Sequence, residues 1–173
     1  MNVSKDVWLE RANNLQERRG KEVIKNSVQG VDDYKSHIYK GWIGKKVLDV
    51  GCGSMTIKKH LPLGCSYTGI DPFPLSEEVM NISIEQCNFE ENSFETIYAF
   101  AMLDNIYDLK TAIENMKRIA SKNVMILTGV EIDPDQYHTM KITEPMLNEL
   151  FYGWMINYKE YLHPKILLIE YWK

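Results

Sequence analysis

The sequence predicts an α/β fold in which helices cover a mostly parallel sheet. Short apolar runs that end at turn residues recur along the middle of the chain, as at residues 46–50 and 94–100. A segment with helical periodicity, from about Leu109 to Ala120, separates two of these runs. The 173 residues, 45% hydrophobic and 25% charged, are enough for a single domain with a buried core.

The first part of the chain is predicted to be helical. Apolar residues recur at helical spacing from Val7 to about Gln29, and Gly20 is expected to interrupt this segment. A short helix is expected to open at residues 32–34 and to end before Gly44. We therefore expect residues 1–43 to form a helical lid over a core of residues 44–173, within one domain.

The rest of the chain is predicted to build the sheet and its helices. A short helix is expected over residues 54–61, stopped by Pro62, and another begins after the N-cap Thr143 and runs to about Tyr152. The brief turn around Pro164 implies that the last two strands are antiparallel. Strands are expected at residues 46–50, 67–70, 82–85, where the pattern is weakest, 94–100, 124–128, 154–158 and 166–172.

Composition excludes several classes of protein. The first ten residues lack an apolar targeting segment and no apolar run is long enough to span a membrane, so a cytoplasmic protein is expected. Cys52, Cys65 and Cys87 lack CxxC spacing, which favours reduced thiols and gives no zinc site. Residues 1–46 carry a net charge of +4 within a chain of net charge −4, which favours a solvated helical surface or, alternatively, a face for an anionic partner.

Four segments, in order along the chain, carry a functional signal. Gly51 and Gly53 follow the first strand and allow the backbone to approach a ligand at the carboxyl edge of the sheet. Asp71 and Pro72 end the second strand. The four segments are Val47–Gly53, Thr68–Pro72, Cys87–Glu90 and Ser93–Asp108.

Together these segments resemble the class I S-adenosylmethionine-dependent methyltransferase family, from about Gly44 to the C-terminus. The resemblance implies a Rossmann-like three-layer sandwich. Its sheet would have seven strands, mostly parallel, with an antiparallel C-terminal pair. It also implies S-adenosyl-L-methionine as the cofactor and methyl transfer as the reaction.

The resemblance also implies roles for particular residues. Asp49 would organise the site around the amino-acid end of the cofactor, and Asp71 would accept hydrogen bonds from both ribose hydroxyls. Asn88 would bind the adenine amino group, with Phe89 beside the ring. A helix N-cap or turn for Asp71, and a turn for Asn88, are the structural alternatives. The full cofactor-binding set is Asp49, Gly51, Cys52, Gly53, Asp71, Pro72, Asn88, Phe89, Phe100, Ala101 and Asn105.

A nicotinamide-binding fold is the main competing interpretation of the glycine turn. Its G-x-G-x-x-G fingerprint requires a glycine at position 56, where this chain has Thr56, so the methyltransferase interpretation is favoured. Met55 departs from the family pattern as well, since a glycine often stands at that position. This departure bears on how the cofactor lies.

Methyl transfer from a sulfonium depends mainly on in-line positioning, so neither a metal nor a catalytic triad is expected. His138 and Asp104 are the candidate catalytic residues, and Tyr34, His37 and His138 are the candidate substrate residues. A surface histidine, a helix cap and a core aromatic residue are the respective structural alternatives for His138, Asp104 and Tyr34.

The segment after the fourth strand bears on the methyl acceptor. Residues 101–104 lack the Asp/Asn-Pro-Pro-aromatic pattern of enzymes that methylate amino groups of bases, so a small-molecule acceptor is expected. Two alternatives stay open. One is a non-catalytic Rossmann-like binding or regulatory protein. The other is an RNA or protein methyltransferase that uses the basic N-terminal residues Arg18, Arg19, Lys21 and Lys25.

Overall fold

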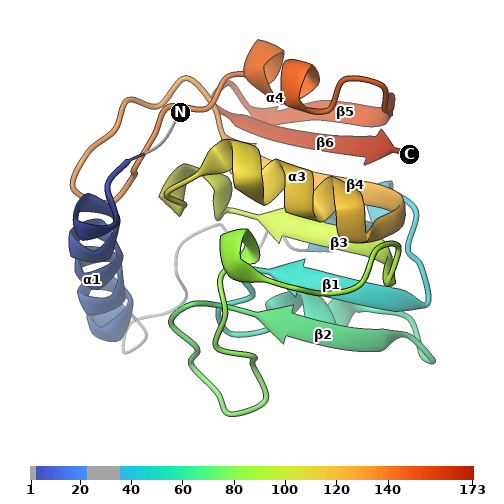
Figure 1. The fold of residues 1–173 in the computed structure, drawn as a ribbon, viewed down its shortest axis with the longest axis horizontal. Coiled ribbons are helices and arrows are strands. Elements are labelled where there is room, and N and C mark those ends of the chain that lie inside the picture. The colour runs from blue at the N-terminus through green and yellow to red at the C-terminus, as the bar shows by residue number, and fades with distance from the viewer. Residues whose placement is uncertain (1–2, 23–35) are drawn as a thin grey trace.

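Six strands form one sheet in the computed structural model, which describes residues 3–22 and 36–173 (Figure 1). The strand order is β2-β1-β3-β4-β6-β5, and neighbours among β1 to β4 are parallel, whereas β6 runs antiparallel to β4 and β5. The mostly parallel sheet with an antiparallel C-terminal pair is thus confirmed. The strands are β1 (Lys46–Val50), β2 (Ser66–Ile70), β3 (Phe94–Phe100), β4 (Ala120–Gly129), β5 (Met155–His163) and β6 (Ile166–Trp172).

Hydrophobic side chains pack on both faces of the sheet. Leu48 and Val50 point to the face covered by α3 (Leu109–Ile119), while Val47 belongs to a second cluster that includes Ile38 and Ile57. Those two residues come from the 3-10 helices η1 (Ser36–Lys40) and η2 (Thr56–His60). Burial on both faces explains why the central strands read as continuous apolar runs.

The helix caps follow the sequence closely. The Asp108 side chain accepts a hydrogen bond from the Thr111 amide (3.1 Å) and starts α3. Thr143 caps α4 (Glu144–Leu150) in the same way, by accepting from the Met146 amide at 3.2 Å. Both helices begin where the sequence predicts them.

The prediction of a strand at residues 82–85 is wrong. In its place the chain forms a 3-10 helix, η3 (Ile84–Gln86), and only a single bridge, between Ile70 and Met80, extends the sheet beyond β2. Pro72 lies in the connecting segment and lacks the amide that a ladder requires. Among the described residues the sheet therefore has six strands, where seven were expected.

The turn after β1 also differs from expectation. Residues 54–61 do not form an α-helix; they contain η2, which is shorter and tighter. Gly51, Gly53 and Met55 all have positive φ, at 66°, 50° and 56°. Met55 thus keeps the left-handed backbone that glycine adopts most easily, although it carries a side chain.

The N-terminal helix α1 (Lys5–Glu22) runs through Gly20 without the predicted break. It stands beyond the end of the sheet to which the arrows of β1, β2 and β3 point (Figure 1). Of the short helix predicted to open at residues 32–34, only η1 lies within the described residues. None of the helices in residues 3–22 and 36–173 combines the length and apolar character needed to cross a membrane.

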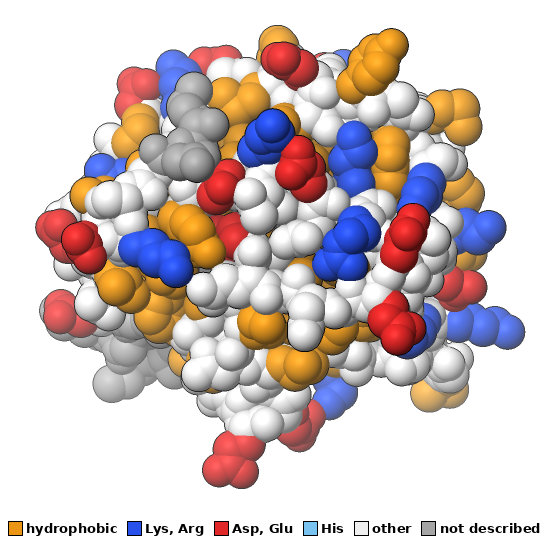
Figure 2. Space-filling model, viewed as in Figure 1, with side chains coloured by type: hydrophobic (Ala, Val, Ile, Leu, Met, Phe, Trp, Pro, Cys, Tyr) orange, Lys and Arg blue, Asp and Glu red, His pale blue; other side chains and the backbone are white. Residues whose placement is uncertain are grey.

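The surface that carries α3 shows acidic and basic side chains interspersed rather than gathered by sign (Figure 2). An interspersed surface of this kind produces no extended field of one sign. This face therefore offers no track for a polyanion.

We expect glycine at position 55 to stabilise the fold more than alanine does. A left-handed residue with a Cβ costs about 1–2 kcal/mol. The Met55→Gly protein should therefore exceed Met55→Ala in free energy of unfolding by about 1 kcal/mol, as measured by urea denaturation. The comparison removes the methionine side chain from both proteins. Alanine equal to or better than glycine, the usual order inside regular helices and strands, would contradict the strained turn.

Candidate functional site

A cavity lies between α1 and the carboxyl ends of the parallel strands. It encloses about 660 Å³ of empty space, a volume that includes the part open to solvent. Parallel α/β sheets bind ligands at this edge. The lining residues come from α1 (Trp8, Arg11, Ala12, Leu15), from the ends of β1 and β2 (Val50, Gly51, Asp71, Pro72, Phe73), from the edge segment (Ile82, Ser83, Ile84, Glu85) and from the segments after β3 and β4 (Ala101, Met102, Asn105, Ile106, Tyr137, Thr139).

The carboxylate of Asp71 joins two turns at the floor of this cavity. Its Oδ2 accepts a hydrogen bond from the Gly53 amide (3.0 Å) and its Oδ1 accepts one from the Phe73 amide (2.8 Å). Asp71 is 5% exposed, and each oxygen retains a lone pair for a further donor. A Cβ on Gly51 would stand 2.7 Å from the Cβ of Met102, so this turn has no room for a side chain.

Asp49 and Cys52 lie beneath the turn and do not line the cavity. The Asp49 carboxylate accepts a hydrogen bond from the Tyr67 hydroxyl at 2.8 Å, and both Asp49 and Cys52 are buried. Burial, followed by the Asp49 charge, raises the pKa of Tyr67. The Tyr67 hydroxyl therefore keeps its proton and its hydrogen bond to the Asp49 carboxylate, and this bond fixes β1 against β2.

The edge of the cavity beside β2 is formed by Ser83, Ile84 and Glu85. The Asn115 side chain on α3 donates to the Ile84 carbonyl (2.9 Å), and the Glu85 carboxylate accepts from the Tyr107 amide (3.1 Å). Burial raises the pKa of Glu85. This segment thus brings a hydroxyl and a partly desolvated carboxyl group to the cavity.

The segment after β3 contributes Ala101 and Asn105. Ala101 has a positive φ of 55° and lines the cavity with the smallest side chain. The Nδ2 of Asn105 donates to the Asp104 carboxylate at 3.2 Å, whereas its buried Oδ1 has no hydrogen-bond partner within the described part of the chain. A buried acceptor of this kind needs a donor, which a water or a bound molecule can supply.

The helix α1 is fastened across the cavity by side chains that donate to main-chain carbonyls. Trp8 Nε1 donates to the Asn105 carbonyl (2.9 Å), Arg11 to that of His138 (2.7 Å), and Asn14 to that of Gln136 (3.1 Å). These contacts join α1 to the segments that follow β3 and β4.

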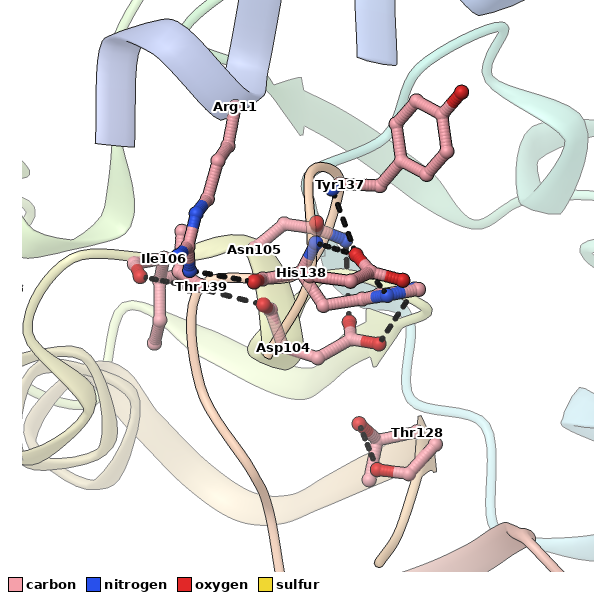
Figure 3. Close-up of polar contacts among 10 residues, drawn as sticks. Arg11, Asp104, Asn105, Ile106, Thr128, Tyr137, His138 and Thr139 are labelled. Atoms are coloured by element: carbon pink, nitrogen blue, oxygen red, sulfur yellow. Dashed lines mark hydrogen bonds and ion pairs between the residues drawn. The ribbon is translucent and has the colours of Figure 1, made fainter. Parts of the chain in front are cut away.

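Behind the cavity wall, His138 lies between two carboxylates (Figure 3). Its Nδ1 is 2.9 Å from Asp135 Oδ1 and its Nε2 is 3.8 Å from Asp104 Oδ2. Burial raises the pKa of Asp104, and the nearby His138 opposes this shift in part. Thr139 donates through its hydroxyl to the carbonyls of Asp104 (2.9 Å) and Ile106 (2.6 Å), which fixes the loop.

The structure brings together some of the sequence-predicted residues and separates others. Gly51, Asp71, Pro72, Ala101 and Asn105 line the cavity, and Gly53 contacts it through Asp71. Five others do not line it and lie behind the lining residues: Asp49, Cys52, Phe100, Asp104 and His138.

Three further candidates lie away from the cavity. Asn88 is exposed, and the Phe89 ring packs on Phe94 at 5.1 Å, near the start of β3 and so at the opposite end of the sheet. His37 lies near Lys40 and Glu160, where burial and then Lys40 lower its pKa. Tyr34 falls outside the described residues.

Sequence reasoning missed Trp8, Arg11, Ser83 and Glu85 as lining residues. The apolar spacing around Trp8 and Arg11 predicted only a helix, and spacing alone cannot distinguish a side chain that faces the core from one that faces a cavity. Ser83 and Glu85 lay within the segment predicted to be a strand. Their alternation with Ile82 and Ile84 was the only local signal.

Comparisons with known proteins agree with this architecture. A protein-family model described as a methyltransferase domain matches residues 17–159. No curated protein matches the chain.

Several solved structures share the fold. The 1,6-didemethyltoxoflavin-N1-methyltransferase of Burkholderia thailandensis, solved with its substrate and S-adenosylhomocysteine, has a TM-score of 0.73 at 16% identity, over 99% of this chain and 93% of that one. The magnesium protoporphyrin IX methyltransferase of Synechocystis PCC 6803, with bound SAH, has a TM-score of 0.70 at 13% identity, over 98% and 100%. A SAM-dependent methyltransferase of Aquifex aeolicus has a TM-score of 0.66 at 14% identity, over 88% and 97%.

The raised pKa of Asp104 predicts how the free energy of unfolding depends on pH. A carboxyl group whose folded-state pKa exceeds its unfolded value binds protons more tightly in the folded state, so it destabilises the fold as the pH rises above the ordinary range near 3.9. The free energy of unfolding of the native protein should therefore fall relative to that of Asp104→Asn as the pH rises from about 4 towards neutrality. Urea denaturation at several pH values measures this difference.

The exposed Glu77 supplies the control, since Glu77→Gln should keep the pH profile of the native protein. Parallel profiles for the native and Asp104→Asn proteins would show that the burial of Asp104 carries no such penalty.

Proposed function

This chain belongs to the methyltransferase domain family, and from that premise we propose that it is an S-adenosylmethionine-dependent methyltransferase acting on a small molecule. The observation that carries the proposal is the cavity at the carboxyl ends of β1, β2 and β3, with the buried Asp71 carboxylate in its floor. When bound, S-adenosylmethionine supplies a methyl group already activated by the positive sulfonium.

The lining residues fit the cofactor in polarity. We assign Asp71 to the ribose hydroxyls, because its oxygens keep lone pairs free after binding the amides of Gly53 and Phe73. We assign the segment Ile82–Glu85 to the adenine, with two isoleucines as apolar walls. The unpaired Oδ1 of Asn105 can accept from the amino group of the cofactor's amino-acid end.

A small acceptor is supported by the enclosure and lining of the cavity. The helix α1 covers the cavity, and apolar side chains such as Trp8, Phe73 and Ile106 dominate its wall. Two of the similar structures are enzymes whose names specify small molecules, 1,6-didemethyltoxoflavin and magnesium protoporphyrin IX. The side chains of Arg18, Arg19, Lys21 and Lys25 lie outside the described part, which therefore gives no support to an RNA acceptor.

The chain's contribution to catalysis is positioning and exclusion of water. An acceptor atom aligned about 3–3.5 Å from the methyl carbon in a closed site accounts for much of the acceleration of such a reaction. We propose that α1 acts as the lid, with Trp8, Arg11 and Asn14 holding it closed; residues 1–2 and 23–35 of the expected lid lie outside the described part of the chain. His138 and Asp104 hold the loop after β4 in place, since both imidazole nitrogens of His138 face carboxylates.

The ribose assignment is tested by calorimetry with S-adenosylhomocysteine. We expect Asp71→Ala to weaken binding by about tenfold or more, because hydrogen bonds to a charged group contribute about 1.5–3 kcal/mol. The control is Glu77→Gln, which removes an exposed carboxylate from the same segment and should leave the affinity unchanged.

Two outcomes would count against the proposal. Unchanged affinity in a folded Asp71→Ala protein would remove the ribose assignment alone. Failure of the native protein to bind S-adenosylmethionine or its product, combined with binding of a nicotinamide dinucleotide, would overturn the function itself.

A further inference from the structure

Arg11 is the only Lys or Arg that lines the cavity within the described part of the chain. Among the described residues, its guanidinium donates one hydrogen bond, through Nη1 to the His138 carbonyl at 2.7 Å, and forms no ion pair (Figure 3). The carboxylates at the cavity are engaged elsewhere, Asp71 with two amides and Glu85 with the Tyr107 amide. A cation with most of its donors unused therefore faces the cavity.

The surroundings of Arg11 favour an anion as its partner. Ala12 and Leu15, its neighbours on α1, and Ile106 are apolar, so few other groups compete for the guanidinium. A guanidinium presents parallel donors that match the two oxygens of a carboxylate, and such charge-assisted pairs are about twice as strong as neutral hydrogen bonds.

Aromatic side chains supply flat walls close to Arg11. Trp8, one turn earlier on α1, packs against Phe73 with ring centroids 5.5 Å apart and an angle of 41° between the planes. Both rings line the cavity, as does Tyr137. Flat apolar walls with one cationic group suit a planar ring that bears a single negative charge.

We propose that Arg11 binds the carboxylate of the methyl acceptor, and that the acceptor is a small aromatic acid. The inference rests on the proposed function. Arg11 reaches the loop after β4, whereas the Gly51–Gly53 turn follows β1 and Asp71 follows β2. In the sheet order β2-β1-β3-β4, one strand separates β1 from β4, so Arg11 lies on the acceptor side of the cofactor residues.

The test compares benzoate with benzamide, which has the same ring but no charge. Each is titrated by calorimetry into the native protein saturated with S-adenosylhomocysteine. Benzoate should bind at least tenfold more tightly, and Arg11→Gln, which keeps a donor for the His138 carbonyl, should abolish the preference. Arg11→Lys should retain a reduced preference. Glu10→Gln, an exposed carboxylate on the same helix, should leave the ratio unchanged.

A second titration separates the acceptor from the cofactor as the source of the carboxylate. S-adenosylhomocysteine carries an amino-acid carboxylate and 5′-methylthioadenosine does not, so the ratio of their affinities should be the same in Arg11→Gln as in the native protein. Selective loss of S-adenosylhomocysteine affinity would assign Arg11 to the cofactor and overturn the inference. Equal or undetectable binding of benzoate and benzamide to the native protein, or a preference that survives in Arg11→Gln, would also overturn it.

The two proposals fail in different ways. The native protein could bind neither S-adenosylhomocysteine nor methylthioadenosine and still prefer benzoate to benzamide through Arg11. That result would refute the cofactor assignment and support an anion site at Arg11. Binding of S-adenosylhomocysteine without a preference for benzoate would support the cofactor assignment and refute the anion site.

Discussion

The hydrogen bonds from the Gly53 and Phe73 amides to the Asp71 carboxylate are the constraint on which the cavity depends. They tie the turn after β1 to the turn after β2. Neither turn can shift without exposing the buried Asp71 carboxylate or removing one of its hydrogen-bond donors. A buried carboxylate is tolerated only where donors surround it. The left-handed backbone at Gly51, Gly53 and Met55 follows from the same requirement, because the turn must fold tightly enough to aim an amide at Asp71.

The sequence was sufficient for features that local patterns encode. The bounds of β1, β3 and β6 were predicted to the residue, since each is an apolar run bounded by turn residues. The N-cap Thr143 and the position of Asp71 after β2 are equally local features of the sequence. The edge segment was missed because Ile82 and Ile84 alternate as in a strand, although they turn inward to line a cavity. The partners of Arg11 and His138 arise from contacts between distant parts of the chain, which no spacing rule contains.

Two different kinds of contact hold the mouth of the cavity. The loop after β4 is fixed from inside, by the Thr139 hydroxyl on two carbonyls and by His138 between Asp104 and Asp135. The helix α1 is fixed from outside by three side-chain donors. The contacts of the Thr139 hydroxyl are buried and costly to break, whereas the three α1 contacts are partly buried or exposed. The helix α1 is therefore the element that can open with less loss of free energy.

The acceptors of the α1 contacts are main-chain carbonyls, those of Asn105, Gln136 and His138. Every residue type carries such a carbonyl, so the loops after β3 and β4 can exchange side chains during evolution while the helix remains fastened. In the proposed function, the choice of acceptor by these loops is thereby uncoupled from closure of α1. The arrangement makes the loops suitable positions for a mutagenesis library that redirects the enzyme to new acceptors.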